Sequence, residues 1–207
     1  MQEKDFFYQD LIPKANLQTF LTKKNISLDD IVQQTPWNKY ALVKMEQTHS
    51  ANSFFVKKRV AQLVPNVDAV YTDQKEVLLT IKTADCLPVF IYHPYPMIAA
   101  IHAGRAGTQK NILAKTLQAI MRDFQIKDNF TIWFGPAICN NCYQIDPVQD
   151  LYYNLKEENK KQINEVIDLK TSKIIDFPFC TSCRNDLFYS YRKEKTDKRI
   201  WSGIVLK

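Results

Sequence analysis

Apolar and polar positions alternate with a period of two through the middle of the chain, and this is the pattern of β-strands. Val77, Leu79 and Ile81 share one face of such a strand. We expect that face to be more deeply buried than the face that carries Leu78, Thr80 and Lys82. The same reasoning predicts strands in six segments: 40–46, 53–58, 69–72, 77–83, 88–92 and 97–102.

A helical stripe of apolar residues follows these strands. Apolar side chains recur three or four positions apart over 108–124, which predicts a helix with one buried face. Pro147 suits the first turn of a helix that continues to about Lys161. Three shorter segments complete the expected order: an apolar run at 130–134, a helix at 186–193 and a strand at 199–206.

The first 38 residues have a mixed pattern that we interpret as helix and loop, with a capping-box-like helix start at Ser27–Asp30. The chain has no internal repeat, no low-complexity tract and no linker rich in glycine or serine. We therefore predict one domain spanning 1–207, of the α/β class, with a mixed β-sheet flanked by helices.

Composition narrows the class of protein. Apolar residues make up 45% of the chain, enough for a full core, which excludes a disordered tail. The net charge of +6 is spread along the chain, and we interpret it as solvated helix faces, with attraction for anionic substrates or nucleic acid as the alternative. The N-terminus lacks the pattern of a secretory signal, and no segment is long and apolar enough for a membrane span. We expect a cytoplasmic protein, and the odd number of five cysteines fits a reducing compartment.

Three residues point to a metal. His49, Cys86 and His102 lie at loop entries after predicted strands. Two imidazoles and one thiolate are the ligand set of an open zinc site. The chain has only three histidines, so two of them in such positions are informative. From spacing alone, a buried cysteine with two surface histidines remains the alternative. Asp85, beside the thiol, is either an orienting or proton-carrying group or a turn residue.

Two further sequence patterns suggest binding sites, one for a metal ion and one for an anion. Cys139-x2-Cys142 and Cys180-x2-Cys183 are spaced like the halves of a zinc site with four cysteine ligands. Residues 143–179 between them form a longer spacer than the roughly 15–20 residues of such sites, so inert or redox-sensitive thiols are the favoured interpretation. In the HAGRAG segment, small residues before a helix suit an anion such as phosphate, with Arg105 nearby, or an ordinary helix cap.

Taken together, these residues resemble the laccase-domain family, first named polyphenol oxidases and now described as purine nucleoside phosphorylases with a zinc site. The resemblance implies a single α/β domain that acts as a monomer, with zinc ligands at His49, Cys86 and His102. Five stretches carry it: KMEQTHS at 44–50, DAVYTDQKEVLLTIKTADCLPVFI at 68–91, AAIHAGRAGT at 99–108, FGPAICNNCYQID at 134–146 and CTSCRNDLFYSYRKEKTDKR at 180–199.

The resemblance implies phosphorolysis, in which a purine nucleoside and phosphate give the free base and ribose 1-phosphate. Family members are also described as deaminating adenosine, which suits a zinc-bound water, and as cleaving methylthioadenosine. The departing purine needs a proton, for which Asp85 or a zinc-bound water is a candidate. Arg105 and Arg192 are the expected phosphate contacts. Cys142 matches a cysteine of the family's CCYEV segment, and we expect it to be one of the substrate-binding residues. The family reads HAGWRG where this chain reads HAGRAG, so Arg105 replaces a tryptophan.

Three other functions compete with this one. A hydrolase that edits peptidoglycan precursors would use the same zinc site. A nucleic-acid-binding protein with a zinc ion on four cysteines would instead use the two CxxC pairs, although we do not expect a nucleic-acid partner. A copper polyphenol oxidase ranks last, because three histidines cannot furnish a multicopper cluster.

Overall fold

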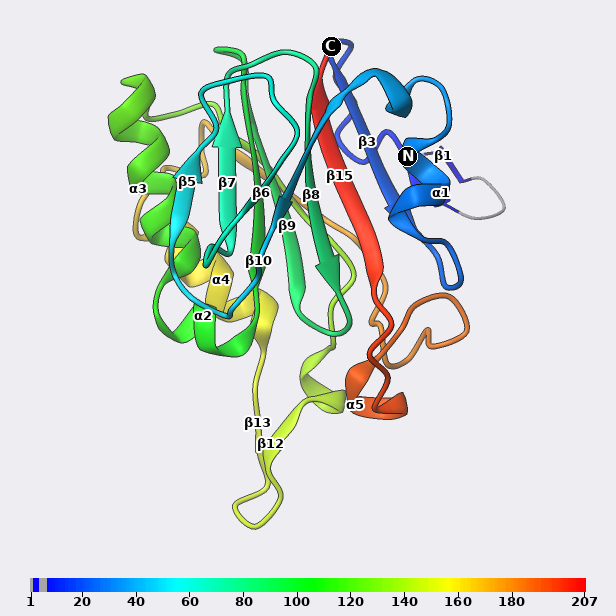
Figure 1. The fold of residues 1–207 in the computed structure, drawn as a ribbon. Coiled ribbons are helices and arrows are strands. Elements are labelled where there is room, and N and C mark those ends of the chain that lie inside the picture. The colour runs from blue at the N-terminus through cyan, green and yellow to red at the C-terminus, as the bar shows by residue number, and fades with distance from the viewer. Residues whose placement is uncertain (1, 4–6) are drawn as a thin grey trace.

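The computed structural model describes residues 2–3 and 7–207 as two β-sheets packed face to face, with helices on both outer sides (Figure 1). The first sheet runs β1 (Gln2–Glu3), β2 (Phe7–Gln9), β3 (Leu17–Thr22), β15 (Ile200–Leu206), β8 (Val77–Thr83), β4 (Ala41–Met45) and β6 (Gln62–Val64). The second runs β14 (Lys173–Asp176), β11 (Thr131–Phe134), β9 (Leu87–His93), β10 (Met97–Ala103), β7 (Ala69–Thr72) and β5 (Ser53–Phe55). The α/β class and the mixed strand pairing are confirmed, with the strands divided between two sheets.

The main core lies between the two sheets. Phe90 of β9 stacks on Trp133 of β11 with ring centroids 5.0 Å apart, and Leu79 of β8 belongs to the same buried cluster. The other face of β8 is buried at Leu78, which packs with Trp37 under the N-terminal helices, and is exposed at Lys82. The expectation that one face of this strand would be more deeply buried is therefore confirmed: the face of Val77, Leu79 and Ile81 is buried along its whole length, and the opposite face ends at the exposed Lys82.

Helices α3 (Ile112–Phe124) and α4 (Leu155–Asn164) cover the outer face of the second sheet (Figure 1). The helix expected over 108–124 is divided into α2 (Arg105–Gln109) and α3, because Asn111 adopts a left-handed backbone conformation with φ of 62°.

Pro147 does not begin a helix. It lies in the turn between β12 (Gln144–Asp146) and β13 (Leu151–Tyr152), which form a hairpin that projects from the body of the molecule (Figure 1). Helix α4 begins later, where the Asn154 side chain accepts a hydrogen bond from the backbone N–H of Glu157. A capping side chain specifies where a helix begins more strongly than a proline does, because proline fits a turn as well as the first position of a helix.

The two ends of the chain also differ from expectation. Helix α1 (Leu28–Val32) has the capping box expected at Ser27–Asp30, but β2 and β3 replace the helix and loop expected before it; residues 1 and 4–6 lie outside the described residues. Helix α5 (Tyr191–Glu194) is shorter than the predicted 186–193. Two single turns of 3-10 helix complete the order, η1 (Trp37–Lys39) and η2 (Asn140–Cys142).

Candidate active site

Three chain connections meet at one end of the sandwich. Residues 84–86 connect β8 in the first sheet to β9 in the second, and β9 pairs with β10 so that Leu87 lies opposite Ala103. Cys86 is thus placed beside His102, the next-to-last residue of β10. His49 comes from the connection between β4 and β5.

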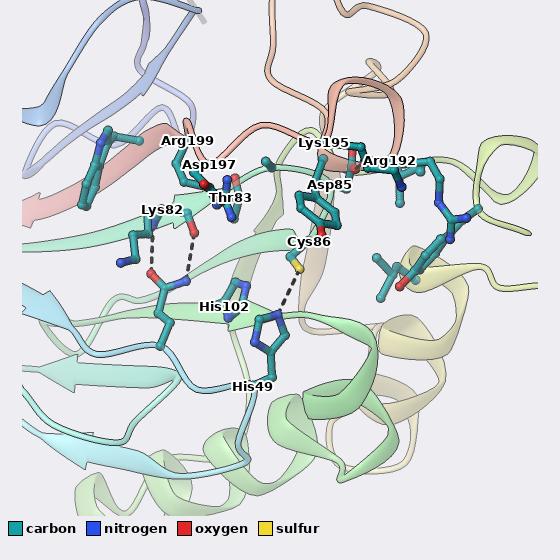
Figure 2. A pocket seen from close by; sticks show the side chains of 17 residues that line it. His49, Lys82, Thr83, Asp85, Cys86, His102, Arg192, Lys195, Asp197 and Arg199 are labelled. Atoms are coloured by element: carbon teal, nitrogen blue, oxygen red, sulfur yellow. Dashed lines mark hydrogen bonds between the residues drawn. The ribbon is translucent and has the colours of Figure 1, made fainter. Parts of the chain in front are cut away.

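The three predicted metal ligands converge there. One donor atom from each of His49, Cys86 and His102 lies within 4.8 Å of the others. The Cys86 Sγ atom is 3.7 Å from His49 Nε2, and the two imidazole rings meet edge to face with centroids 4.8 Å apart. Figure 2 shows the three side chains directed toward one another. The arrangement suits a single ion bound by two nitrogens and one sulfur.

A buried carboxylate that the sequence did not single out organises this cluster. Asp68 Oδ1 lies 2.7 Å from His102 Nδ1 and accepts the backbone N–H of His49 at 3.1 Å. Asp68 Oδ2 accepts the N–H and the hydroxyl of Ser50 at 2.6 and 2.7 Å. Burial opposes the charge of Asp68, but the hydrogen bonds from His102 and Ser50 outweigh it and hold the pKa of this carboxyl well below its usual range. An aspartate just before an apolar strand is the only signal in the sequence.

The backbone around the ligands is unusual. His49 and Asp85 both have positive φ, 57° and 85°, and such conformations in residues other than glycine concentrate at functional sites. At Gly104, a Cβ atom would lie 2.6 Å from His49 Cδ2 and 3.0 Å from Cys86 Sγ. The glycine after β10 is therefore what allows the chain to pass this close to the donor atoms.

The thiol and the imidazole shift one another's titration. Burial would raise the pKa of Cys86, but the positive charge of His102 and hydrogen bonds from both histidines lower it to about 6. Burial would likewise lower the pKa of His102, but Cys86 and Asp68 raise it to about 9. Without a metal the pair is thus a thiolate and an imidazolium near neutral pH. A thiolate is also the form in which cysteine binds metals.

Asp85 is held on both sides. Its Oδ1 accepts the hydroxyl of Thr181 at 2.6 Å and its Oδ2 accepts the backbone N–H of Arg192 at 2.7 Å. Its backbone oxygen accepts the N–H of Ile138 at 3.0 Å. One nearly buried residue thereby joins three segments far apart in the sequence, and its side chain lines the cleft described next.

A cleft of about 960 Å³ opens over the ligand cluster (Figure 2). Four cationic side chains line it: Lys82, Arg192, Lys195 and Arg199. Three aromatic side chains line it as well: Tyr143, Tyr191 and Trp201. Cations suit an anionic ligand, and aromatic rings suit a flat, partly apolar one. The size is that of a cleft for a small organic molecule.

The two arginines expected to contact phosphate lie in different places. Arg192 lines the cleft, with its guanidinium 5.3 Å from the centre of the Tyr143 ring. Arg105 is half-buried at the start of α2 and is not among the residues that line the cleft. Its influence is electrostatic: burial raises the pKa of Tyr143, and the charge of Arg105 offsets part of that rise.

The remaining cysteines form a second group of potential metal ligands. The Sγ atoms of Cys139, Cys142, Cys180 and Cys183 all lie within 4.8 Å of one another. The long spacer that counted against such a site does not keep the pairs apart. Cys142, expected among the substrate-binding residues, lies within this group and not among the residues that line the cleft.

Comparisons with known proteins agree with the fold. A purine nucleoside phosphorylase of Campylobacter jejuni, Cj1217c, is 32% identical over 178 residues, covering 80% of this chain and 77% of the relative. An adenosine deaminase, RL5, from an unknown prokaryotic organism is 24% identical over 197 residues, covering 80% and 75%. The crystal structure of YlmD from Geobacillus stearothermophilus superposes with a TM-score of 0.88 at 25% identity, covering 100% of this chain and 98% of that one.

A family model for the "Multi-copper polyphenol oxidoreductase laccase" matches residues 24–152 and 148–207, which together span most of the chain. The described residues contain no helix long and apolar enough to cross a membrane. Sequence match, fold and convergence of the expected ligands agree, and the chain belongs to this laccase-domain family.

Proposed function

We propose that the chain is a zinc-dependent purine nucleoside phosphorylase, which converts a purine nucleoside and phosphate into the free base and ribose 1-phosphate. The observation that carries this proposal is the convergence of His49, Cys86 and His102 in a cleft lined by cations and aromatic rings. The name of the Campylobacter relative supports the reaction class.

The donor set fits zinc. His102 uses Nδ1 for Asp68, which leaves Nε2 as its ligand atom, and a carboxylate behind a ligating histidine is the usual support of a zinc site. Three protein ligands leave a position open for substrate. The family's name refers to copper, but the chain has three histidines in all, too few for a multicopper cluster. When bound here, zinc supplies Lewis-acid polarisation of an oxygen of the substrate or of water.

Binding of the two substrates follows from the lining of the cleft. Arg192, Lys195 and Arg199 offer positive charge for phosphate, and arginine can hold two phosphate oxygens at once. Tyr143 and Tyr191 offer rings against which a purine can pack. Phosphate then attacks C1′ of the ribose, a C–O bond forms, and the C–N bond to the base breaks with its electron pair going to the purine.

The departing purine takes up a proton. Asp85 is the acidic side chain in the cleft that stands beside a proposed metal ligand. Both its oxygens already accept hydrogen bonds, from Thr181 and from Arg192, so its first role is to position Arg192 at the wall of the cleft. Proton delivery by Asp85 requires that one of these bonds be released.

Deamination of adenosine is the second candidate, because RL5 is named an adenosine deaminase and the same open metal position would serve it. Product analysis separates the reactions. Adenosine, inosine and methylthioadenosine are incubated with the chain, with and without phosphate, and the products are resolved by chromatography. Phosphorolysis gives free base and a sugar 1-phosphate only when phosphate is present: ribose 1-phosphate from adenosine or inosine, and 5-methylthioribose 1-phosphate from methylthioadenosine. Hydrolysis gives the corresponding free sugar, and deamination of adenosine gives inosine.

Two variants make this assay specific. Cys86→Ala removes a proposed ligand and is expected to abolish product, whereas Gln118→Ala, on the exposed side of α3, is expected to leave turnover unchanged. Base release that survives Cys86→Ala, or that does not depend on phosphate, would contradict the proposal.

We also propose that the protein acts as a monomer in the cytoplasm. The five free cysteines fit a reducing compartment. Light scattering after size exclusion is expected to give a mass near 24.2 kDa, and a mass near twice that value would contradict a monomer.

A further inference from the structure

We propose that Cys139, Cys142, Cys180 and Cys183, hereafter the four-cysteine cluster, bind a second Zn²⁺ ion that serves a structural role and is separate from the ion at His49. The proposal rests on the strand pairing, the sulfur geometry and the hydrogen bonds at the sulfur atoms.

Strand pairing explains how the two CxxC pairs meet. β11 and β14 lie side by side in parallel, with Phe134 opposite Asp176, so the segments that leave them run in the same direction. The pairing continues beyond the strands: the N–H of Phe177 donates to the oxygen of Phe134 at 2.8 Å, and Ala137 forms a parallel bridge with Cys180. Each segment therefore delivers its CxxC pair to the same place.

The distances fit a tetrahedral zinc ion. The Sγ atoms of Cys142 and Cys183 are 3.6 Å apart, and all four lie within 4.8 Å of one another. Zn–S bonds of about 2.3 Å in a regular tetrahedron place sulfur atoms about 3.8 Å apart. A disulfide would instead bring two sulfurs to about 2.05 Å, and all five cysteines of the chain are free.

Backbone N–H groups support the sulfur atoms. The N–H groups of Cys139 and Cys183 both donate to Cys180 Sγ, at 3.2 and 3.4 Å. Such donors stabilise a thiolate and orient it, as the outer contacts of metal ligands do. Cys183 is exposed and its three partners are half-buried, so an ion can enter and a chelator can reach it.

The position of the cluster implies its role. Four thiolates complete the coordination of zinc and leave no open position for a substrate. The ion would clamp the segment 137–143 to the segment 180–184. The first segment carries Tyr143 of the cleft, and the second carries Thr181, whose hydroxyl holds Asp85. A metal in the four-cysteine cluster would thus fix one wall of the cleft without touching the reacting atoms.

Metal content and X-ray absorption test the proposal. In Cys86→Ala, which disables the other site, we expect one zinc per chain with four sulfur neighbours at about 2.3 Å. Cys142→Ala combined with Cys183→Ala is expected to lose that ion and to keep the one at His49, and Ser182→Ala, between two ligands, serves as the matched control with unchanged zinc. Absence of zinc from Cys86→Ala, or intact mass showing disulfides between the four cysteines, would overturn the proposal.

A second measurement avoids substitutions. Unmodified chain loaded with Co²⁺ is expected to show the intense sulfur-to-metal absorption of tetrathiolate ligation, and chelation is expected to increase hydrogen exchange in 137–143 and 180–184. Co²⁺ absorption spectra that show only mixed imidazole–thiolate ligation, together with unchanged hydrogen exchange in these segments, would refute the second site. This test holds even if a cysteine variant fails to fold.

Discussion

Asp68 Oδ1 lies 2.7 Å from His102 Nδ1, and the same carboxylate binds the backbone N–H groups of the loop that carries His49. One buried acid therefore sets the orientation of both imidazoles. It fixes His102 through its ring and His49 through its backbone, and it leaves both rings free to face Cys86.

Asp68→Asn keeps the shape of the side chain but removes its charge. A carboxylate hydrogen-bonded to a metal-binding histidine raises the basicity of the imidazole and orients the ring. We therefore expect the metal affinity of the site formed by His49, Cys86 and His102, hereafter the His49 site, to fall about 10–100-fold. Competition with a chelator, followed by the Co²⁺ absorption of imidazole–thiolate ligation, measures this. Asp10→Asn, on the surface, is the control, and equal affinity in the two variants would show that Asp68 does not support the ligands.

Metal affinity at this site should depend on pH. Between about pH 6 and pH 9 the metal-free pair is a Cys86 thiolate and a His102 imidazolium, and metal can bind His102 only after its proton leaves. Affinity is therefore expected to rise by about tenfold per pH unit across this window and to level off above it. Calorimetry in buffers of different ionisation enthalpy should show about one proton released per ion. A pH-independent affinity would contradict the ion pair.

Alanine substitutions at Gly104 and Gly203 distinguish loss of metal binding from loss of stability of the fold. A Cβ at position 104 would lie 2.6 Å from His49 Cδ2, so we expect metal binding to fail while the melting temperature changes little. A Cβ at position 203 would lie 2.3 Å from Phe20 Cε1 in the core, so we expect a lower melting temperature in chains that still bind metal when folded. Calorimetry and metal analysis of both variants check this, and full metal binding by Gly104→Ala would refute the close approach.

The interface between the sheets should dominate stability. Phe90 is fully buried and stacked on Trp133, so Phe90→Ala is expected to lower the free energy of unfolding by about 3–5 kcal/mol. Val148, 94% exposed in the projecting hairpin, should tolerate alanine with a change within about 0.5 kcal/mol. Urea unfolding of both variants measures the difference. A loss below about 1 kcal/mol in Phe90→Ala would mean that the sheets do not share a tightly packed core.

Local patterns predicted the central strands well. The bounds expected for 69–72 and 77–83 are those of β7 and β8, because runs of apolar and β-branched residues specify a strand without help from distant parts of the chain. The N-terminal strands were missed because β2 and β3 are short and depend on pairing with each other and with β15 at the other end of the chain.

The site could be predicted only where its chemistry is unusual. His49, Cys86 and His102 stand out as rare residue types in family motifs, whereas Asp68 acts through hydrogen bonds that exist only after β7 and β10 have paired. The meeting of the two CxxC pairs was likewise hidden, because it depends on the parallel pairing of β11 with β14 across the spacer 143–179.

Metal-dependent phosphorolysis is the most direct test of the proposed function. Chain stripped of metal is titrated with Zn²⁺ while release of adenine from adenosine is followed in the presence of phosphate. We expect activity to appear as zinc fills the His49 site, and Cys86→Ala to stay inactive at every zinc concentration. Full phosphorolysis by the metal-free chain, or activity restored to Cys86→Ala by zinc, would contradict a zinc-centred phosphorylase.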